Sequence, residues 1–323
     1  MTLFYHIIGV VGFLSVATIV ISYMIFRMAF YSDRSKKYDP YFGIDKGCYK
    51  KYEKESRELI DNILSLECER VYIRSRDGLM LSGRYYHVKD GAPLEIQCHG
   101  YKSTPMRDFS GSGKWAYKVP YNMLLIDQRA HGESEGKVIS FGINERFDLL
   151  EWIKWSIDRF GNDVKIILYG ISMGAATVLM AAGENLPENV RGVVADCPYS
   201  SALQIIKKVA RDMGYPPKLA TPFIILGAKL FGGFSINSMT PLMAVKKAKL
   251  PILLVHGEAD GFVPCDMSRE IARANENIIF ETFPGADHGI SYFEDQERYI
   301  SLVHGFVESL VYNDEGENNE SKR

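Results

Sequence analysis

The chain has 323 residues, of which 46% are hydrophobic, and its formal net charge at neutral pH is −2. This length can bury one large core, so the sequence predicts one main globular domain. The near-neutral charge gives no electrostatic reason to expect nucleic-acid binding, which usually needs a strongly basic face, and we expect no nucleic-acid partner.

Residues 1–30 form the first distinct segment and predict a retained transmembrane anchor. No charged side chain occurs from Thr2 to Phe26, and a span of about 20 apolar residues matches the bilayer core. A cleaved signal peptide is the competing interpretation, but the segment lacks a basic start and a small-residue cleavage site. Lysines and arginines follow the span and none precede it, which places the C-terminal part in the cytoplasm, although a large domain can be exported despite such charges.

The five cysteines give no reason to expect a disulfide framework, a metal site or a cofactor. They are odd in number, widely spaced and without a CxxC pair, at Cys48, Cys68, Cys98, Cys197 and Cys265. Their pattern fits a reducing compartment, as expected for buried free thiols.

Residues 31–66 are predicted as a linker and a helix ahead of the main domain. The polar, tyrosine-rich stretch Tyr31–Lys46 precedes a helical run, Tyr49–Leu66. Two alternating segments then read as a hairpin with a turn at Arg76-Asp77-Gly78.

From residue 94 onward, short apolar runs alternate with helical patterns, which predicts a mostly parallel sheet covered by helices on both faces. The strands are predicted at Leu94–Cys98, Asn122–Ile126, Val164–Tyr169, Gly192–Asp196, Ile252–His256 and Ile278–Phe283. Long amphipathic helices are predicted at Asn144–Phe160 and Tyr292–Tyr312. We assign residues 67–312 to this domain and residues 313–323 to a disordered acidic tail.

About fifty residues separate the strand ending at Asp196 from the one starting at Ile252, more than a crossover needs. Most of this insertion is helix-like, and we predict a small helical cap at about residues 200–248. Thr240-Pro241 reads as a helix N-cap followed by proline in the first turn.

The segment Gly170–Gly174 reads GISMG and matches G-x-S-x-G between a strand and a helix. A side chain at either glycine would clash in so tight a turn, while Ser172 would project its hydroxyl above the sheet. A simple serine N-cap is the alternative, but the context favours a nucleophile.

A serine nucleophile needs a base and an orienting acid, in the chain order serine, acid, histidine. His288 and Asp260 follow later strands and are predicted for these roles. Asp196 is the second candidate for the acid, while Glu258 and Asp287 fit less well. His256 is interpreted as structural, and His99 and His131 precede the serine.

Two backbone N–H groups are predicted to stabilise an oxyanion. Met173 follows the nucleophile, and Tyr101 follows a strand and a His-Gly turn.

Together these motifs resemble the α/β-hydrolase superfamily. They are, in chain order, Cys98–Tyr101, Asp127–Ser134, Gly170–Gly174, His256–Asp260 and Asp287-His288. The chain is most similar to the serine aminopeptidase and monoacylglycerol-lipase-like branch, and within it to bacterial members with one N-terminal membrane span. The resemblance covers about Glu69–Leu310 and implies an eight-stranded sheet with an antiparallel second strand. It also implies that Asp127, Arg129 and His131 support a turn near the site.

The sequence therefore predicts a serine hydrolase, most consistent with a carboxylic-ester hydrolase that uses a small acyl substrate. Relatives that cleave carbon–halogen bonds or epoxides carry aspartate at the elbow, so serine indicates acyl transfer. Thioesterase and peptidase activities are alternatives, and a catalytically inactive membrane-tethered scaffold is an alternative of another class. The apolar run PFIILGAKLFGGF in the cap could line an acyl pocket, pack the core, or dip into a bilayer toward lipid-borne esters.

Overall fold

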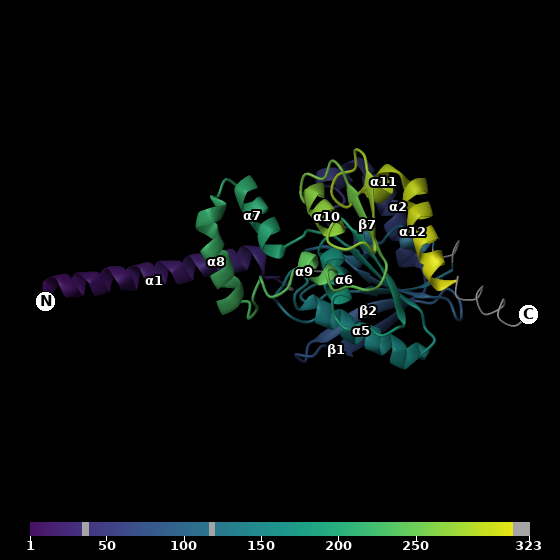
Figure 1. Cartoon of the computed structure of the whole chain (residues 1–323), viewed down its shortest axis with the longest axis horizontal. Helices are drawn as coiled ribbons and strands as arrows, with labels where there is room; N and C mark the ends of the chain where they lie inside the picture. Colours follow the sequence, from purple (N-terminus) through teal and green to yellow (C-terminus); the bar gives the residue numbers. More distant parts are fainter. Residues whose placement is uncertain (34–38, 116–119, 313–323) are drawn as a thin grey trace, which may run out of the picture.

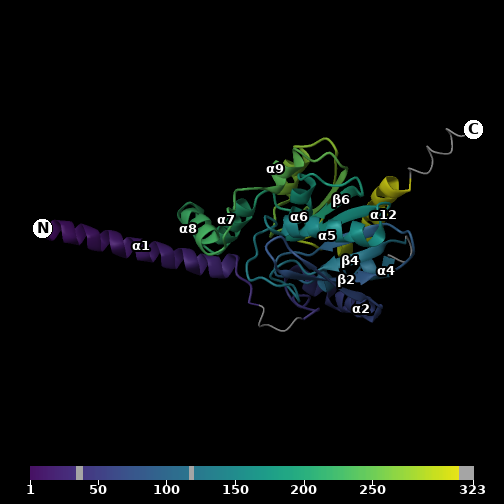
Figure 2. The same ribbon diagram turned by 90° about the horizontal axis from the view of Figure 1, so that it is seen from below.

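A computed structural model describes residues 1–33, 39–115 and 120–312 of the chain. Most of the chain forms a rounded body around a central sheet, and one long helix extends away from it (Figures 1 and 2). The predicted acidic tail lies outside the described residues.

The sheet has eight strands in the order β1-β2-β4-β3-β5-β6-β7-β8. β2 pairs antiparallel with both β1 and β4, and all other neighbours are parallel, as the family resemblance implies. The strands are β1 (Glu69–Arg74), β2 (Met80–Tyr86), β3 (Leu94–Cys98), β4 (Asn122–Ile126), β5 (Ile166–Ile171), β6 (Val190–Asp196), β7 (Ile252–Gly257) and β8 (Ile278–Phe283). The predicted bounds are correct for β3, β4 and β8, whereas β5 begins and ends two residues later than predicted because it continues to the elbow.

Alternate residues of the buried strands supply two separate cores. In β5, Ile166 and Leu168 pack with α5 (Glu145–Phe160), α6 (Met173–Ala182) and α10 (Cys265–Ala272). Ile167 and Tyr169 point to the other face, toward α2 (Glu53–Ser65) and α12 (Gln296–Val311). Both faces of the sheet are therefore covered, and the loops at the carboxyl ends of the parallel strands share one edge.

Two predicted helices are each divided in the structure. The run from Tyr49 begins as a 3-10 helix, η1 (Gly47–Tyr52), before α2. The predicted C-terminal helix is split into α11 (Ser291–Glu294) and α12, because the carboxylate of Asp295 accepts a hydrogen bond from the N–H of Arg298 and starts a new helix. The remaining short helices of the described body are α3 (Pro105–Asp108) and α4 (Ser112–Trp115).

The insertion after β6 contains α7 (Ala202–Asp212), α8 (Pro217–Leu230) and α9 (Pro241–Val245). Thr240 caps α9 through a hydrogen bond from the N–H of Met243, and Pro241 lies in the first turn, as predicted. α7 and α8 stand away from the sheet, alongside the second half of α1 (Figures 1 and 2).

α1 (Thr2–Ala29) is the only helix among the described residues that is long and apolar enough to cross a membrane, a property that an N-terminal signal sequence shares. Its first half is exposed, but Ser22 and Phe26 are buried, and Phe30 just beyond it is fully buried. Gly227 of α8 packs so closely that a methyl group there would lie 2.6 Å from the carbonyl oxygen of Ser22. The end of α1 is thus packed into the cap.

Candidate active site

The turn between β5 and α6 holds Ser172 in a strained conformation, with φ 56° and ψ −113°. A Cβ at Gly170 would lie 2.3 Å from backbone atoms of Gly174, and a Cβ at Gly174 would lie 1.8 Å from the carbonyl oxygen of Cys98. Both glycines are therefore required sterically, as predicted from the motif. The turn places the Ser172 hydroxyl at the carboxyl edge of the sheet, beside the N-terminus of α6.

Loops after β7 and β8 bring Asp260 and His288 to this hydroxyl. Nε2 of His288 lies 2.9 Å from Oγ of Ser172, and Nδ1 of His288 lies 2.7 Å from Oδ2 of Asp260. Since the carboxylate accepts from Nδ1–H, Nε2 of the neutral imidazole accepts from the serine hydroxyl. The three groups form one continuous hydrogen-bonded row.

Asp260 is buried and fully hydrogen-bonded. Its Oδ1 accepts from the N–H groups of Phe262 (2.9 Å) and Val263 (2.7 Å), and Nε2 of His256 lies 3.1 Å from Oδ2. Burial alone would raise the pKa of Asp260, but the hydrogen bonds from His256 and His288 outweigh it and hold this pKa well below its ordinary value. The carboxylate is thus ionised at neutral pH.

The other acids considered for this role lie elsewhere. Asp196 accepts a hydrogen bond from the Tyr299 hydroxyl at 2.8 Å, and burial raises its pKa to about 6. Asp287 accepts from the N–H of Gly261 at 2.9 Å and so joins the two loops, while Glu258 accepts from Thr282 on the surface.

The loop after β3 carries one of the two predicted oxyanion donors, Tyr101, and is held by hydrogen bonds from several sides. The N–H of Gly100 donates to Oδ2 of Asp108 at 2.7 Å, and the N–H of Lys102 donates to Nε2 of His131 at 3.0 Å. Between them, the N–H of Tyr101 has no acceptor among the described residues, and neither does that of Met173 in the first turn of α6. Both N–H groups are therefore free to bind an external oxygen.

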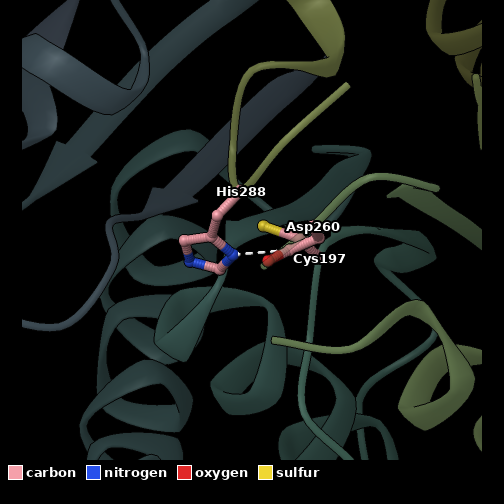
Figure 3. A group of neighbouring side chains, drawn as sticks. All are labelled: Cys197, Asp260 and His288. Carbon is pink, nitrogen blue, oxygen red and sulfur yellow. Dashed lines mark hydrogen bonds and ion pairs between the residues drawn. The ribbon is translucent and has the colours of Figure 1, made fainter. Parts of the chain in front are cut away.

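Cys197 lies beside Asp260 and His288, and the three groups offer atoms within 4.8 Å of one another (Figure 3). Burial raises the pKa of its thiol well above the ordinary value, which favours the protonated form, whereas metals bind the thiolate. The histidine and the carboxylate already bond to each other, so the arrangement is explained without an ion.

Comparisons with known proteins agree with this fold. A family model described as the alpha/beta hydrolase fold matches residues 116–239. The Bacillus subtilis protein YqkD is 23% identical over 269 residues, covering 82% of this chain and 88% of YqkD. The solved Pyrococcus furiosus esterase Pf2001 is 26% identical with a TM-score of 0.62, covering 77% of this chain and 93% of that chain.

The chain has the α/β-hydrolase fold. A shorter match extends over 132 residues to the thiohydrolase aneE of Aspergillus aculeatus, at 29% identity over 39% of this chain and 40% of that protein. The related proteins support a hydrolase, and the fold places the row of Ser172, His288 and Asp260 at the edge where ligands of open α/β sheets bind.

The histidines that precede the serine in this hydrolase serve the loops around the site. Nε2 of His99 accepts from the N–H of Gln128, and burial lowers the pKa of His99 to about 4. Burial likewise lowers the pKa of His131 to about 3, so both rings are neutral. Arg129 pairs with Asp148 and Asp77.

Asp127 of the same segment pairs with Arg84 on β2. The segment Asp127–Ser134 therefore contains several ion pairs and hydrogen bonds to neighbouring elements, consistent with the supporting role that the resemblance implies.

Tyr49 and Asp108, which lie near the row, were not predicted from the sequence, whereas His131 and His256 were expected to have supporting roles. Tyr49 of η1 donates to the carbonyl oxygen of Gly289 at 3.0 Å and supports the loop of His288. Asp108 and His131 hold the loop of Tyr101, and His256 bonds to Asp260. The family resemblance indicated the role of His131, and the spacing of four residues between His256 and Asp260 places both in one strand-to-loop segment.

A pocket of about 680 Å³ opens onto Ser172. Its walls come from α1, the cap helices α7 and α8, and loops at the sheet edge, and they are mainly apolar. This volume is typical of pockets for small organic ligands.

Proposed function

We propose that this chain is a serine hydrolase that cleaves carboxylic esters through an acyl-enzyme on Ser172. The observation that carries the proposal is the unbroken row from Ser172 through His288 to Asp260, with spacings of 2.9 and 2.7 Å. The name esterase carried by the structure at 26% identity supports an ester substrate.

In the first step, Oγ of Ser172 attacks the carbonyl carbon of the ester while its proton passes to Nε2 of His288. The ionised Asp260 stabilises the imidazolium and keeps it oriented. The negative carbonyl oxygen is placed at the free N–H groups of Tyr101 and Met173, which bind this charge more strongly than the neutral carbonyl.

The tetrahedral species then collapses. The C–O bond to the leaving group breaks, and His288 returns the proton to the departing alcohol. Water then gives a proton to Nε2 of His288 and attacks the carbonyl carbon of the acyl-enzyme. The bond between this carbon and Oγ of Ser172 breaks, His288 returns the proton to Oγ, and the acid is released. No cofactor is needed for this sequence.

A thioester substrate is the second candidate, supported by the name thiohydrolase of the Aspergillus relative. The same residues would act, with a thiol as leaving group. Peptidase activity has no comparable support.

We further propose that α1 is a retained single-pass anchor and that the hydrolase domain lies in the cytoplasm. The packing of Phe26, Phe30 and Ser22 into the cap favours retention, because removal of α1 would expose these contacts. The cations after the span favour the cytoplasmic orientation. Digestion of the domain by protease added to intact cells would contradict this orientation, and a mature N-terminus beyond residue 30 would contradict retention.

Covalent labelling tests the function. A short-chain fluorophosphonate should label the purified full chain, and Ser172→Ala should abolish labelling. Ser201→Ala, a change in the cap at a residue that makes no side-chain cap hydrogen bond, should label like the unchanged protein. A folded wild type that is neither labelled nor active on any p-nitrophenyl ester or thioester would support the inactive scaffold instead.

A further inference from the structure

The pocket above Ser172 has a wall that comes from the N-terminal apolar helix. Ile21, Met24, Ile25 and Met28 of α1 line it, opposite residues of α7 and α8. α1 is therefore part of the site as well as the segment long enough to span a bilayer.

Direct hydrogen bonds fix this wall relative to the proposed oxyanion loop. The Tyr101 hydroxyl donates to the carbonyl oxygen of Ala29 at 2.8 Å, and the Lys102 ammonium donates to that of Met28 at 3.2 Å. These carbonyls belong to the last turn of α1, where four such groups lack partners within the helix. The loop that carries the Tyr101 N–H thus caps the C-terminus of α1.

Aromatic and close backbone packing holds the other side of the helix. The rings of Phe26 and Phe231 lie 5.8 Å apart, those of Tyr23 and Phe231 lie 5.1 Å apart, and Gly227 meets the backbone at Ser22. The last two turns of α1 are therefore set between α8 and the loop of Tyr101.

The chemistry of the lining indicates what the pocket holds. Three methionines, Met24, Met28 and Met213, contribute flexible, polarisable side chains that adapt to irregular or mobile apolar groups. Among the described residues that line the pocket, Lys102 is the only charged one, and its ammonium donates to the end of α1. Such walls suit an aliphatic chain better than a polar headgroup or a charged peptide.

We propose that the last three turns of α1 bind the acyl chain of the substrate and set its length, so that the hydrolase acts on long-chain aliphatic esters drawn from the bilayer. This proposal rests on the proposed function of Ser172. Met28 lies next to the oxyanion loop, and Ile21 lies about 10 Å farther along the helix toward its exposed half. The acyl chain would run from Ser172 toward the bilayer along the stripe of α1 formed by Met28, Ile25, Met24 and Ile21.

Tryptophan substitutions along the stripe test the proposal in the full chain, reconstituted in phosphatidylcholine nanodiscs. Ile21 and Met28 are both half-exposed, so each can accept a larger side chain without entering the core. Initial rates are measured on p-nitrophenyl esters from acetyl to palmitoyl. For each ester, the rate of the variant is divided by the rate of the wild type, so that partitioning of the ester into the bilayer cancels from this rate ratio.

Ile21→Trp should lower the ratio about tenfold or more for the longest chains only, because a ring that overfills the far end of the pocket excludes the last methylenes. Met28→Trp should lower the rate ratio for shorter acyl chains as well as for the longest ones, because Met28 lies nearer the oxyanion loop than Ile21 does. Val20→Trp is the matched control, since Val20 is half-exposed on the same helix and does not line the pocket, and its ratio should stay near one for every chain.

Labelling by a short-chain fluorophosphonate separates the two proposals. If all variants are labelled and the chain-length profile is the same in each, the role of α1 is wrong and the serine hydrolase stands. A wild type that prefers acetyl to longer esters would likewise overturn the long-chain substrate. If the wild type is not labelled at all, the proposed function itself fails.

Discussion

His256 and His288 share one acceptor: Oδ2 of Asp260 lies 3.1 Å from Nε2 of His256 and 2.7 Å from Nδ1 of His288. Nε2 of His256 is also 2.9 Å from the carbonyl oxygen of Val263, so it must carry the proton. Nδ1 then accepts from the hydroxyl of Ser268 at 2.6 Å. His256 is fully buried and donates a second hydrogen bond to the carboxylate oxygen that binds His288.

We expect His256 to be a positioning residue. His256→Leu should lower kcat by about 10- to 150-fold, with KM little changed, because loss of one hydrogen bond to a charged group removes about 1.5–3 kcal/mol of orientation energy. His256→Gln, which keeps an N–H donor, should recover part of the rate. The measurement is kcat per site titrated with fluorophosphonate, and a purely structural role would lower the amount of titratable protein while leaving kcat per site unchanged.

A pair of asparagine substitutions distinguishes the two acids that the sequence left open. Asp260→Asn should lower kcat by about 10³–10⁴, because the amide no longer stabilises the protonated form of His288. Asp196→Asn should keep kcat near wild type, because Asp196 bonds to Tyr299 and Asn retains the acceptor. The reverse order of the two kcat values, with both proteins folded, would assign the acid to Asp196.

The fold and the position of the elbow could be predicted from the sequence because both depend on local patterns. Short apolar runs alternating with amphipathic helices indicate a parallel sheet, and two glycines around Ser172 indicate the turn. The convergence of Asp260 and His288 followed from one topological rule, that the carboxyl ends of parallel strands meet at one edge.

The contribution of α1 to the pocket could not be predicted in this way. The helix is apolar on all sides, so its sequence does not indicate which residues are exposed and which line the pocket at Ser172. The side chains of Tyr101 and Lys102 donate to backbone carbonyls of α1. Every residue has such a carbonyl, so the sequence does not indicate these partners. The role of Tyr49 likewise depends on a contact between segments far apart in the chain, whereas Asp108 bonds to Gly100 only eight residues away.

Alanine substitutions at two glycines test the packing of the elbow. Gly174→Ala would place a methyl group 1.8 Å from the carbonyl oxygen of Cys98, between fixed backbone segments, so we expect a loss of several kcal/mol in unfolding free energy or insoluble protein. A methyl group at Gly305 in α12 would meet no other atom within 4 Å, and Gly305→Ala should stabilise by up to about 1 kcal/mol. Thermal unfolding of both proteins gives the comparison, and a Gly174→Ala protein as stable as wild type would contradict the geometry of the turn.

Glu95, near the start of the central strand β3, provides a test of how burial affects a carboxyl group. Its side chain is buried, Oε2 accepts from Gln97 at 2.9 Å, and Oε1 has no partner among the described residues. Burial raises the pKa of this carboxyl to about 7. Between about pH 4.5, where the group ionises in the unfolded chain, and about pH 7, the folded state keeps a proton that the unfolded state has released, so unfolding free energy falls as pH rises.

Glu95→Gln should therefore leave stability at pH 4.5 nearly unchanged and raise it at pH 8 by up to about 3 kcal/mol, because the amide avoids a buried negative charge. Urea unfolding at both pH values measures the difference. Glu276→Gln, at an exposed position ahead of β8, serves as the control and should not change the pH dependence. A Glu95→Gln protein that loses stability at pH 8 would mean that the ionised carboxylate has a stabilising partner and that burial does not dominate its pKa.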